Sequence, residues 1–190
     1  MKKLWLVLVI CGACCSLFAQ TDPLLQQRLN YFMEANRQLH FDSVIAYTYP
    51  KLFTLVPRDE MLEMLQNSFE NEQLTIRLDS LQTDSIYPVF KMQEGSYAKI
   101  RYSLNMIMQL KDSSAAGKEN DLLAAMQAQY GTGKVRLDSA KNIVVQVTAL
   151  MLAAKDKYAR QWCFVNLKDS DPLISQLFTK EIIDKTATYK

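Results

Sequence analysis

The stretch YAKIRYSLNMIMQL, residues 97–110, alternates between apolar and polar side chains over most of its length. Every second residue from Ala98 to Leu110 is apolar or aromatic, and the positions between them include Lys99, Arg101 and Ser103. A period of two places successive side chains on opposite faces of a strand. The pattern predicts a long, half-buried strand of an antiparallel sheet, with one face turned toward a core.

Shorter strand patterns surround this segment, and we expect strands at residues 74–78, 86–92, 143–153 and 158–167, with another beginning near Val135. The polar residues Thr83, Asp84 and Ser85 predict a turn between the first two strands. Pro88 is expected to place the second strand at an edge or a bulge.

Helical periodicity precedes the strands, at residues 22–39, 43–47 and 60–69. Asp22 and Asp42 are the expected N-caps of the first two helices. We further expect a helix at residues 120–130 that ends at Gly131, and a C-terminal helix at residues 172–186. Helices followed by antiparallel strands indicate an α+β fold.

The N-terminus has the features of a secretory signal peptide: Lys2 and Lys3, a short apolar run and small residues before Ala19. We expect cleavage after Ala19, so that residues 1–19 are the signal peptide and residues 20–190 form one domain. The apolar run is short of the roughly 20 residues that cross a bilayer, so no membrane span is expected in the mature chain. Gly12-Ala13-Cys14 offers a lipoprotein signal through Cys14 as the less favoured alternative. The protein is expected to be periplasmic or extracellular.

Three of the four cysteines lie in this leader, so the mature chain keeps only Cys163 and cannot form an internal disulfide. Without Lys2 and Lys3 it has 20 basic and 20 acidic residues. This balance, without a basic stripe, excludes a nucleic-acid partner. One histidine and one cysteine cannot supply a zinc cluster, so neither a metal nor a cofactor is expected.

Three local patterns suggest chemistry but favour simpler interpretations. Gly131-Thr132-Gly133-Lys134 lacks the remaining residues of a phosphate-binding loop and is expected to be a helix stop followed by a turn. His40 and Asp42, two positions apart, do not face one another on a helix. Cys163 is expected in the middle of a strand as a buried small side chain. The sequence therefore predicts no catalytic residue.

Aromatic residues offer the better candidates for a ligand site. Tyr158, Trp162 and Phe164 are expected on one face of the last strand, and Tyr102 lies on the apolar face of residues 97–110. A core packed under helices is the favoured interpretation of these side chains, and a ligand cavity with apolar walls is the alternative.

Several strings resemble small secreted bacterial proteins of the nuclear-transport-factor-2-like superfamily. They are YTYPKL at residues 47–52, VTALML at residues 147–152, and Asp156 followed by Trp162-Cys163-Phe164-Val165. The resemblance implies a cystatin-like cone, in which a curved antiparallel sheet wraps around N-terminal helices and a C-terminal helix follows. It also implies dimerisation through the open sheet face. This superfamily includes isomerases, cyclases, dehydratases and modules that only bind.

Two functions remain open on this basis. The first is a non-enzymatic domain that binds a small apolar ligand or an envelope partner, with Tyr47, Tyr49, Tyr102, Trp162 and Phe164 as the candidate ligand contacts. The second is a ketosteroid-isomerase-like or cyclase-like enzyme that uses a cavity tyrosine and a carboxylate. The apolar faces of the predicted strands contain no acidic residue, which favours the first.

Overall fold

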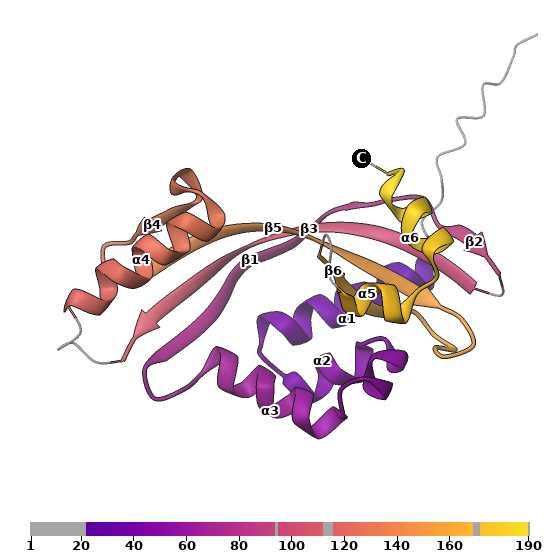
Figure 1. The fold of residues 1–190 in the computed structure, drawn as a ribbon, viewed down its shortest axis with the longest axis horizontal. Coiled ribbons are helices and arrows are strands. Elements are labelled where there is room, and N and C mark those ends of the chain that lie inside the picture. Colours follow the sequence, from indigo (N-terminus) through magenta and orange to yellow (C-terminus); the bar gives the residue numbers. More distant parts are fainter. Residues whose placement is uncertain (1–21, 94, 112–115, 169–171, 190) are drawn as a thin grey trace, which may run out of the picture.

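The computed structural model describes residues 22–93, 95–111, 116–168 and 172–189, so the expected signal peptide and Cys14 lie outside the described residues. The fold is α+β, as predicted, with an open antiparallel sheet that arches over the N-terminal helices (Figure 1). Within these residues, no helix combines the length and the apolar character needed to cross a bilayer.

The N-terminal helices are α1 (Pro23–Arg37), α2 (Phe41–Tyr47) and α3 (Arg58–Phe69), with the 3-10 helix η1 (Pro50–Thr54) between the last two. Asp22 caps α1 as predicted, because its side chain accepts hydrogen bonds from the backbone N–H groups of Leu24 and Leu25. The prediction that Asp42 caps α2 is wrong. The helix starts earlier, at Phe41, so Asp42 lies inside its first turn and His40 takes the N-cap position.

The sheet contains β1 (Leu74–Ile86), β2 (Phe90–Met92), β3 (Gly95–Leu110), β4 (Val135–Leu137), β5 (Ile143–Lys155) and β6 (Cys163–Leu167). Strand β3 lies at the centre, with β1 and β2 on one side and β5 on the other. Both β4 and β6 pair with the far side of β5. A single parallel bridge from Thr48 to Phe164 extends the sheet beyond β6.

The predicted turn at residues 83–85 is wrong, because β1 continues through it as one strand. Two register shifts against β3, at 79/82 and 83/85, take up the extra residues as bulges. Asp84 accepts a hydrogen bond from the Ser103 hydroxyl at 2.7 Å, so this polar segment is held along the strand pair instead of forming a hairpin.

Side chains of β3 divide between two cores, whereas the alternation predicts only one buried face. Ala98, Ile100 and Tyr102 pack under α1, together with Trp162 and Phe164. The opposite face carries Tyr97, which packs against the C-terminal helices α5 (Pro172–Leu177) and α6 (Lys180–Ala187). The part of this second face that the two helices leave open is mostly polar, and includes Gln109, Gln146 and Thr148 among its side chains.

At the other end of the sheet, α4 (Ala116–Tyr130) covers a third cluster, formed by Met108, Val135, Ile143 and Val145 (Figure 1). Gly131 follows the helix with φ 93° and ψ 142°, and its N–H donates to the carbonyl of Gln127 at 2.9 Å. This confirms that residues 131–134 are a helix stop followed by a turn, because only glycine adopts this backbone conformation readily.

The predicted C-terminal helix is two helices. The chain breaks at Phe178 and Thr179, between α5 and α6. Phe178 is buried and its ring stacks on that of Tyr49, with centroids 5.0 Å apart. Burying Phe178 against the sheet bends the chain away from a single continuous helix.

Candidate functional site

A cavity of about 440 Å³ lies where the C-terminal helices meet the sheet. We call it the Tyr49 pocket. Four parts of the chain that are distant in sequence supply its lining, namely the start of η1, the β2–β3 turn with β3, the connection between β5 and β6, and the α5–α6 junction. The lining residues are Tyr49, Lys51, Gln93, Gly95, Tyr97, Asp156, Lys157, Tyr158, Leu177, Phe178, Thr179 and Ile182.

Two tyrosine hydroxyls in this pocket donate to one carboxylate oxygen. Tyr49 Oη lies 2.6 Å from Oδ2 of Asp156, and Tyr97 Oη lies 3.2 Å from the same atom. Gly95 makes room for this arrangement, because a Cβ at this position would clash with the Tyr97 ring and hydroxyl. The aromatic contacts of Phe178, stacked on Tyr49 and edge-on to Tyr97, hold both rings in place.

Backbone groups bind the second oxygen of Asp156. The N–H groups of Tyr158 and Ala159 donate to Oδ1 at 2.9 and 3.2 Å. An aspartate that binds backbone N–H groups two and three residues ahead is a common way of fixing a tight turn. Together with the tyrosines, these bonds occupy all four acceptor positions that a carboxylate offers. The arrangement therefore holds three segments together and leaves no lone pair of Asp156 unused.

Burial and the neighbouring carboxylate both keep the tyrosines protonated. Burial raises the pKa of the Tyr49 hydroxyl far above its ordinary value, and the hydrogen bond to Asp156 raises it further. Burial and the charge of Asp156 raise the pKa of Tyr97 to about 12. Both groups are therefore neutral hydrogen-bond donors throughout the physiological pH range.

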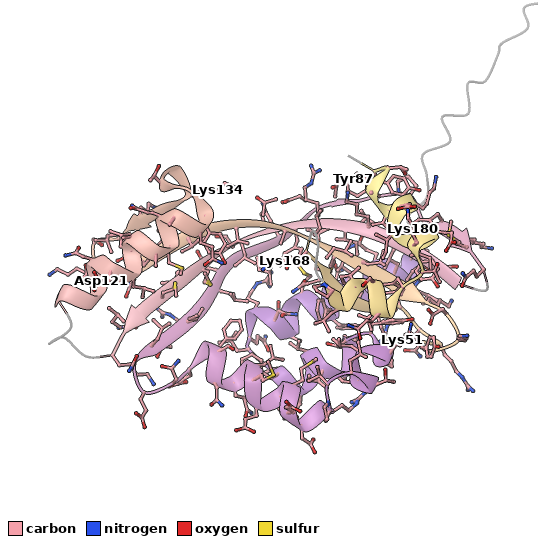
Figure 2. The ribbon with its side chains drawn as sticks, in the orientation of Figure 1. Lys51, Tyr87, Asp121, Lys134, Lys168 and Lys180 are labelled. Carbon is pink, nitrogen blue, oxygen red and sulfur yellow. The ribbon has the colours of Figure 1, made fainter. Side chains whose placement is uncertain are left out.

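Two lysines lie at the rim, and both pack against the exposed ring of Tyr158. Lys51 Nζ lies 5.3 Å and Lys157 Nζ 5.2 Å from its centroid. Lys51 also donates to the carbonyl oxygens of Gln176 and Leu177, at the C-terminal end of α5, next to which it is drawn in Figure 2. Three apolar residues of the lining, Leu177, Phe178 and Ile182, are buried. The pocket thus combines the tyrosine–carboxylate cluster, apolar side chains and two lysines.

The predicted ligand contacts do not share one cavity. Tyr49 lines the Tyr49 pocket, whereas Tyr47 and Trp162 line a separate cavity beside α1. Tyr102 and Phe164 belong to the buried core under α1, where Tyr102 donates to Asn166 Oδ1 at 3.0 Å and Phe164 stacks on Phe32. The packed-core interpretation thus fits Tyr102 and Phe164.

The expectation that Tyr158 shares a strand face with Trp162 and Phe164 is wrong. The last strand begins only at Cys163, and Tyr158 lies in the turn before it with 45% of its surface exposed. The cause is Asp156, whose side-chain bonds to the following N–H groups favour a turn over continued pairing with β5.

Sequence reasoning missed Tyr97 and the role of Asp156. The apolar faces of the predicted strands contain no carboxylate, because Asp156 lies in the connection between β5 and β6. The available signal is that Asp156-Lys157-Tyr158-Ala159 is a turn-forming segment directly after an apolar strand. Tyr97 shares its strand face with Lys99 and Arg101, so its burial under the C-terminal helices is not evident from the alternation.

The earlier catalytic candidates lie apart from this pocket. His40 is exposed at the start of α2, and Cys163 is buried in the cluster under α5 and α6. Burial raises the pKa of the Cys163 thiol, which opposes formation of the nucleophilic thiolate. Among the described residues, no group of three or more His, Cys, Asp or Glu side chains could hold a metal ion.

Comparisons with known proteins assign no family to the chain. No protein-family model matches it, and a search of the curated proteins finds no match.

Proposed function

We propose that the chain is an exported, non-catalytic domain that holds a small, largely apolar ligand in the Tyr49 pocket. The observation that carries this proposal is a cavity whose one carboxylate already has four hydrogen-bond donors. Ligand sites combine apolar walls with a few fixed polar groups, and the lining by Leu177, Phe178 and Ile182 together with the tyrosines has this character.

The alternative, an isomerase-like enzyme, requires a carboxylate and a tyrosine in one cavity, and Asp156 with Tyr49 meets that first requirement. A general base must also reach a proton of the substrate. Tyr49 instead donates directly to Asp156, so no substrate fits between them, and the remaining acceptor positions are taken. The geometry therefore favours binding over catalysis.

We also propose that the chain is a nuclear-transport-factor-2-like domain. The open antiparallel sheet arched over the N-terminal helices supports this proposal (Figure 1). Export by the predicted leader has a direct test in the intact mass of the protein recovered from its host. A chain that begins at Gln20 is expected, and a diacylglyceryl adduct on Cys14 would contradict cleavage after Ala19. Dimerisation through the sheet face is tested by light scattering during size-exclusion chromatography.

Nile red, an uncharged apolar dye, tests the ligand pocket. Thr179 is exposed at the mouth of the pocket, so Thr179→Trp is expected to fill the space and to weaken dye binding at least about tenfold, or about 1.4 kcal/mol. Thr188→Trp, at the other end of α6 and outside the pocket, is the matched control and should bind like the wild type. Failure of the folded wild type to bind the dye, or equal binding by Thr179→Trp, would overturn the proposal.

A further inference from the structure

A second cavity, of about 290 Å³, lies beside the first half of α1. We call it the Arg28 pocket. It is separate from the Tyr49 pocket: Tyr47 and Trp162, which line it, pack with the core under α1, whereas the Tyr49 pocket borders the core under α5 and α6. The connection between β5 and β6 contributes to both, with Lys157 lining the Tyr49 pocket and Arg160 lining the Arg28 pocket.

Three basic side chains line the Arg28 pocket, and no acidic one does. Arg28 comes from α1, Lys155 from the end of β5, and Arg160 from the connection to β6. Across residues 22–93, 95–111, 116–168 and 172–189, none of the three forms a salt bridge. A concave site lined by an excess of charges of one sign concentrates ions of the other sign.

Asp22, the neighbouring carboxylate, is already engaged. Its Oδ2 accepts a hydrogen bond from the Trp162 indole N–H at 3.0 Å. Its Oδ1 accepts from the backbone N–H groups of Leu24 and Leu25, at 2.9 and 3.4 Å. Asp22 therefore serves as a helix cap and an indole acceptor. Burial raises its pKa, but the Trp162 hydrogen bond, the two backbone hydrogen bonds and the charge of Lys155 together lower it. Asp22 thus partly offsets the charge of Lys155, and Arg28 and Arg160 supply the excess positive charge of the pocket.

Arg28 is held in a fixed orientation by the residues around it. Its Nε donates to the carbonyl of Trp162 and its Nη1 to Oε1 of Gln161. The guanidinium lies over the ring of Tyr47, 4.7 Å from the centroid. Arg28 also forms a side-chain hydrogen bond with the Cys163 thiol. These contacts leave part of its five N–H donors for a ligand. A pre-oriented guanidinium with such donors is the group best suited to bind a carboxylate or a phosphate.

Aromatic surface lies next to these charges. The rings of Tyr31 and Tyr47 stack with centroids 6.5 Å apart and an interplanar angle of 22°, and Tyr31 has 54% of its surface exposed. Such a ring offers a flat apolar surface to a ligand whose charged end contacts the arginines.

We propose that the Arg28 pocket binds a small aromatic anion, with its carboxylate or phosphate among Arg28, Lys155 and Arg160 and its ring against Tyr31. The ligand class follows from the combination of an excess of basic side chains and adjoining aromatic surface within one cavity. The proposal does not depend on the ligand of the Tyr49 pocket.

Benzoate and phenyl phosphate are the probes, and benzamide is the uncharged analogue of the first. Titration calorimetry on the wild type is expected to show saturable binding of at least one anion, with benzamide about tenfold weaker, because it loses the charge-assisted hydrogen bonds. The indole N–H resonance of Trp162 should shift during the same titration. The two anions distinguish a carboxylate site from a phosphate site.

Lys155→Gln and Arg160→Gln should each weaken anion binding about threefold to tenfold and leave Nile red binding unchanged. Lys157→Gln is the matched control, because Lys157 is two positions after Lys155 in the chain but lines the Tyr49 pocket. This variant should bind the anion like the wild type. The proposal is overturned if neither anion binds saturably, if benzamide binds as well as benzoate, or if Lys157→Gln weakens binding as much as Lys155→Gln.

Discussion

Tyr49 and Asp156 are 107 positions apart in sequence, yet the phenol of one donates to the carboxylate of the other at 2.6 Å. Tyr97 donates to the same oxygen from a third segment, at the longer distance of 3.2 Å. The contact therefore joins the start of η1, the central strand β3 and the connection between β5 and β6, and it lines the Tyr49 pocket.

Removal of the Tyr49 hydroxyl tests the energetic weight of this contact. Tyr49→Phe is expected to lower the free energy of unfolding by about 1–2 kcal/mol, because hydrogen bonds to charged groups are stronger than neutral ones. Tyr97→Phe should lower the free energy of unfolding by less, since the hydrogen bond from Tyr97 to Asp156 is longer. Urea unfolding followed by circular dichroism measures the stability of both variants. Tyr31→Phe, at an exposed ring, is the control, and a loss as large as that of Tyr49→Phe would contradict the assignment.

Alkaline pH should weaken the fold through the buried tyrosines. The pKa of Tyr97 is raised to about 12 in the folded protein from an ordinary value near 10, so the unfolded chain loses this proton first. Stability contributed by the protonated hydroxyl is fully present below about pH 10 and is lost as the pH rises toward 12. Burial raises the pKa of Tyr102 to about 12 as well. The free energy of unfolding should therefore fall more steeply with pH than Tyr97 alone would make it fall.

Thermal unfolding at a series of alkaline pH values measures this slope. Tyr97→Phe is expected to flatten the dependence of stability on pH. Equal slopes for the wild type and Tyr97→Phe would show that Tyr97 titrates alike in the folded and unfolded chains.

Asp22 and Asp42 form a natural pair for testing helix capping. Asp22→Ala removes the cap of α1 and the acceptor of the buried Trp162 indole, so we expect a loss of about 2 kcal/mol. Asp42→Ala removes an exposed residue from the first turn of α2 and should cost about 0.5 kcal/mol, the scale of an interaction with the helix dipole. Chemical denaturation of both variants under the same conditions measures the two losses of unfolding free energy. A larger loss for Asp42→Ala than for Asp22→Ala would refute the capping assignment.

The two glycines after α4 differ in what they require of the backbone. Gly131 has φ 93° and would be strained with any side chain, so Gly131→Ala is expected to destabilise the protein by about 1–3 kcal/mol. Gly133 has no positive φ, and a Cβ there would meet nothing within 4 Å. Gly133→Ala should be neutral or stabilising by up to about 1 kcal/mol. Thermal melts of the two variants measure the difference in stability. Similar losses of stability in Gly131→Ala and Gly133→Ala would argue against backbone strain at Gly131.

The elements that the sequence predicts well are those with one dominant local signal. Alternation over residues 97–110 fixes the faces of β3, and Asp22 before Pro23 marks the start of α1. The failures have nonlocal causes. The polar residues 83–85 resemble a turn, but pairing with β3 extends β1 through them, and the burial of Phe178 against Tyr49 divides a segment that is continuously helical by pattern.

The candidate site was predicted only in part for the same reason. Tyr49 was named, but Tyr97 and Asp156 join it through tertiary contacts that leave no periodic trace in the sequence. Trp162 and Tyr47 were grouped with Tyr49 as ligand contacts because all are aromatic, and the fold divides them between two cavities. The aromatic residue types indicated which side chains could contact a ligand. The topology of the sheet determines which of them lie in the same cavity.

The separation of 107 residues between Tyr49 and Asp156 also bears on how the chain folds. The Tyr97 contact spans 59 residues, as the Ser96–Lys155 pair of β3 and β5 does, so it can form together with the central sheet. Closing the longer loop costs more entropy before the contact is gained, so we expect the Tyr49 contact to form later. Tyr49→Phe should then speed unfolding far more than it slows folding, as stopped-flow kinetics can measure. A chain that folds in this order would complete its central sheet before Tyr49 reaches Asp156 and closes the Tyr49 pocket.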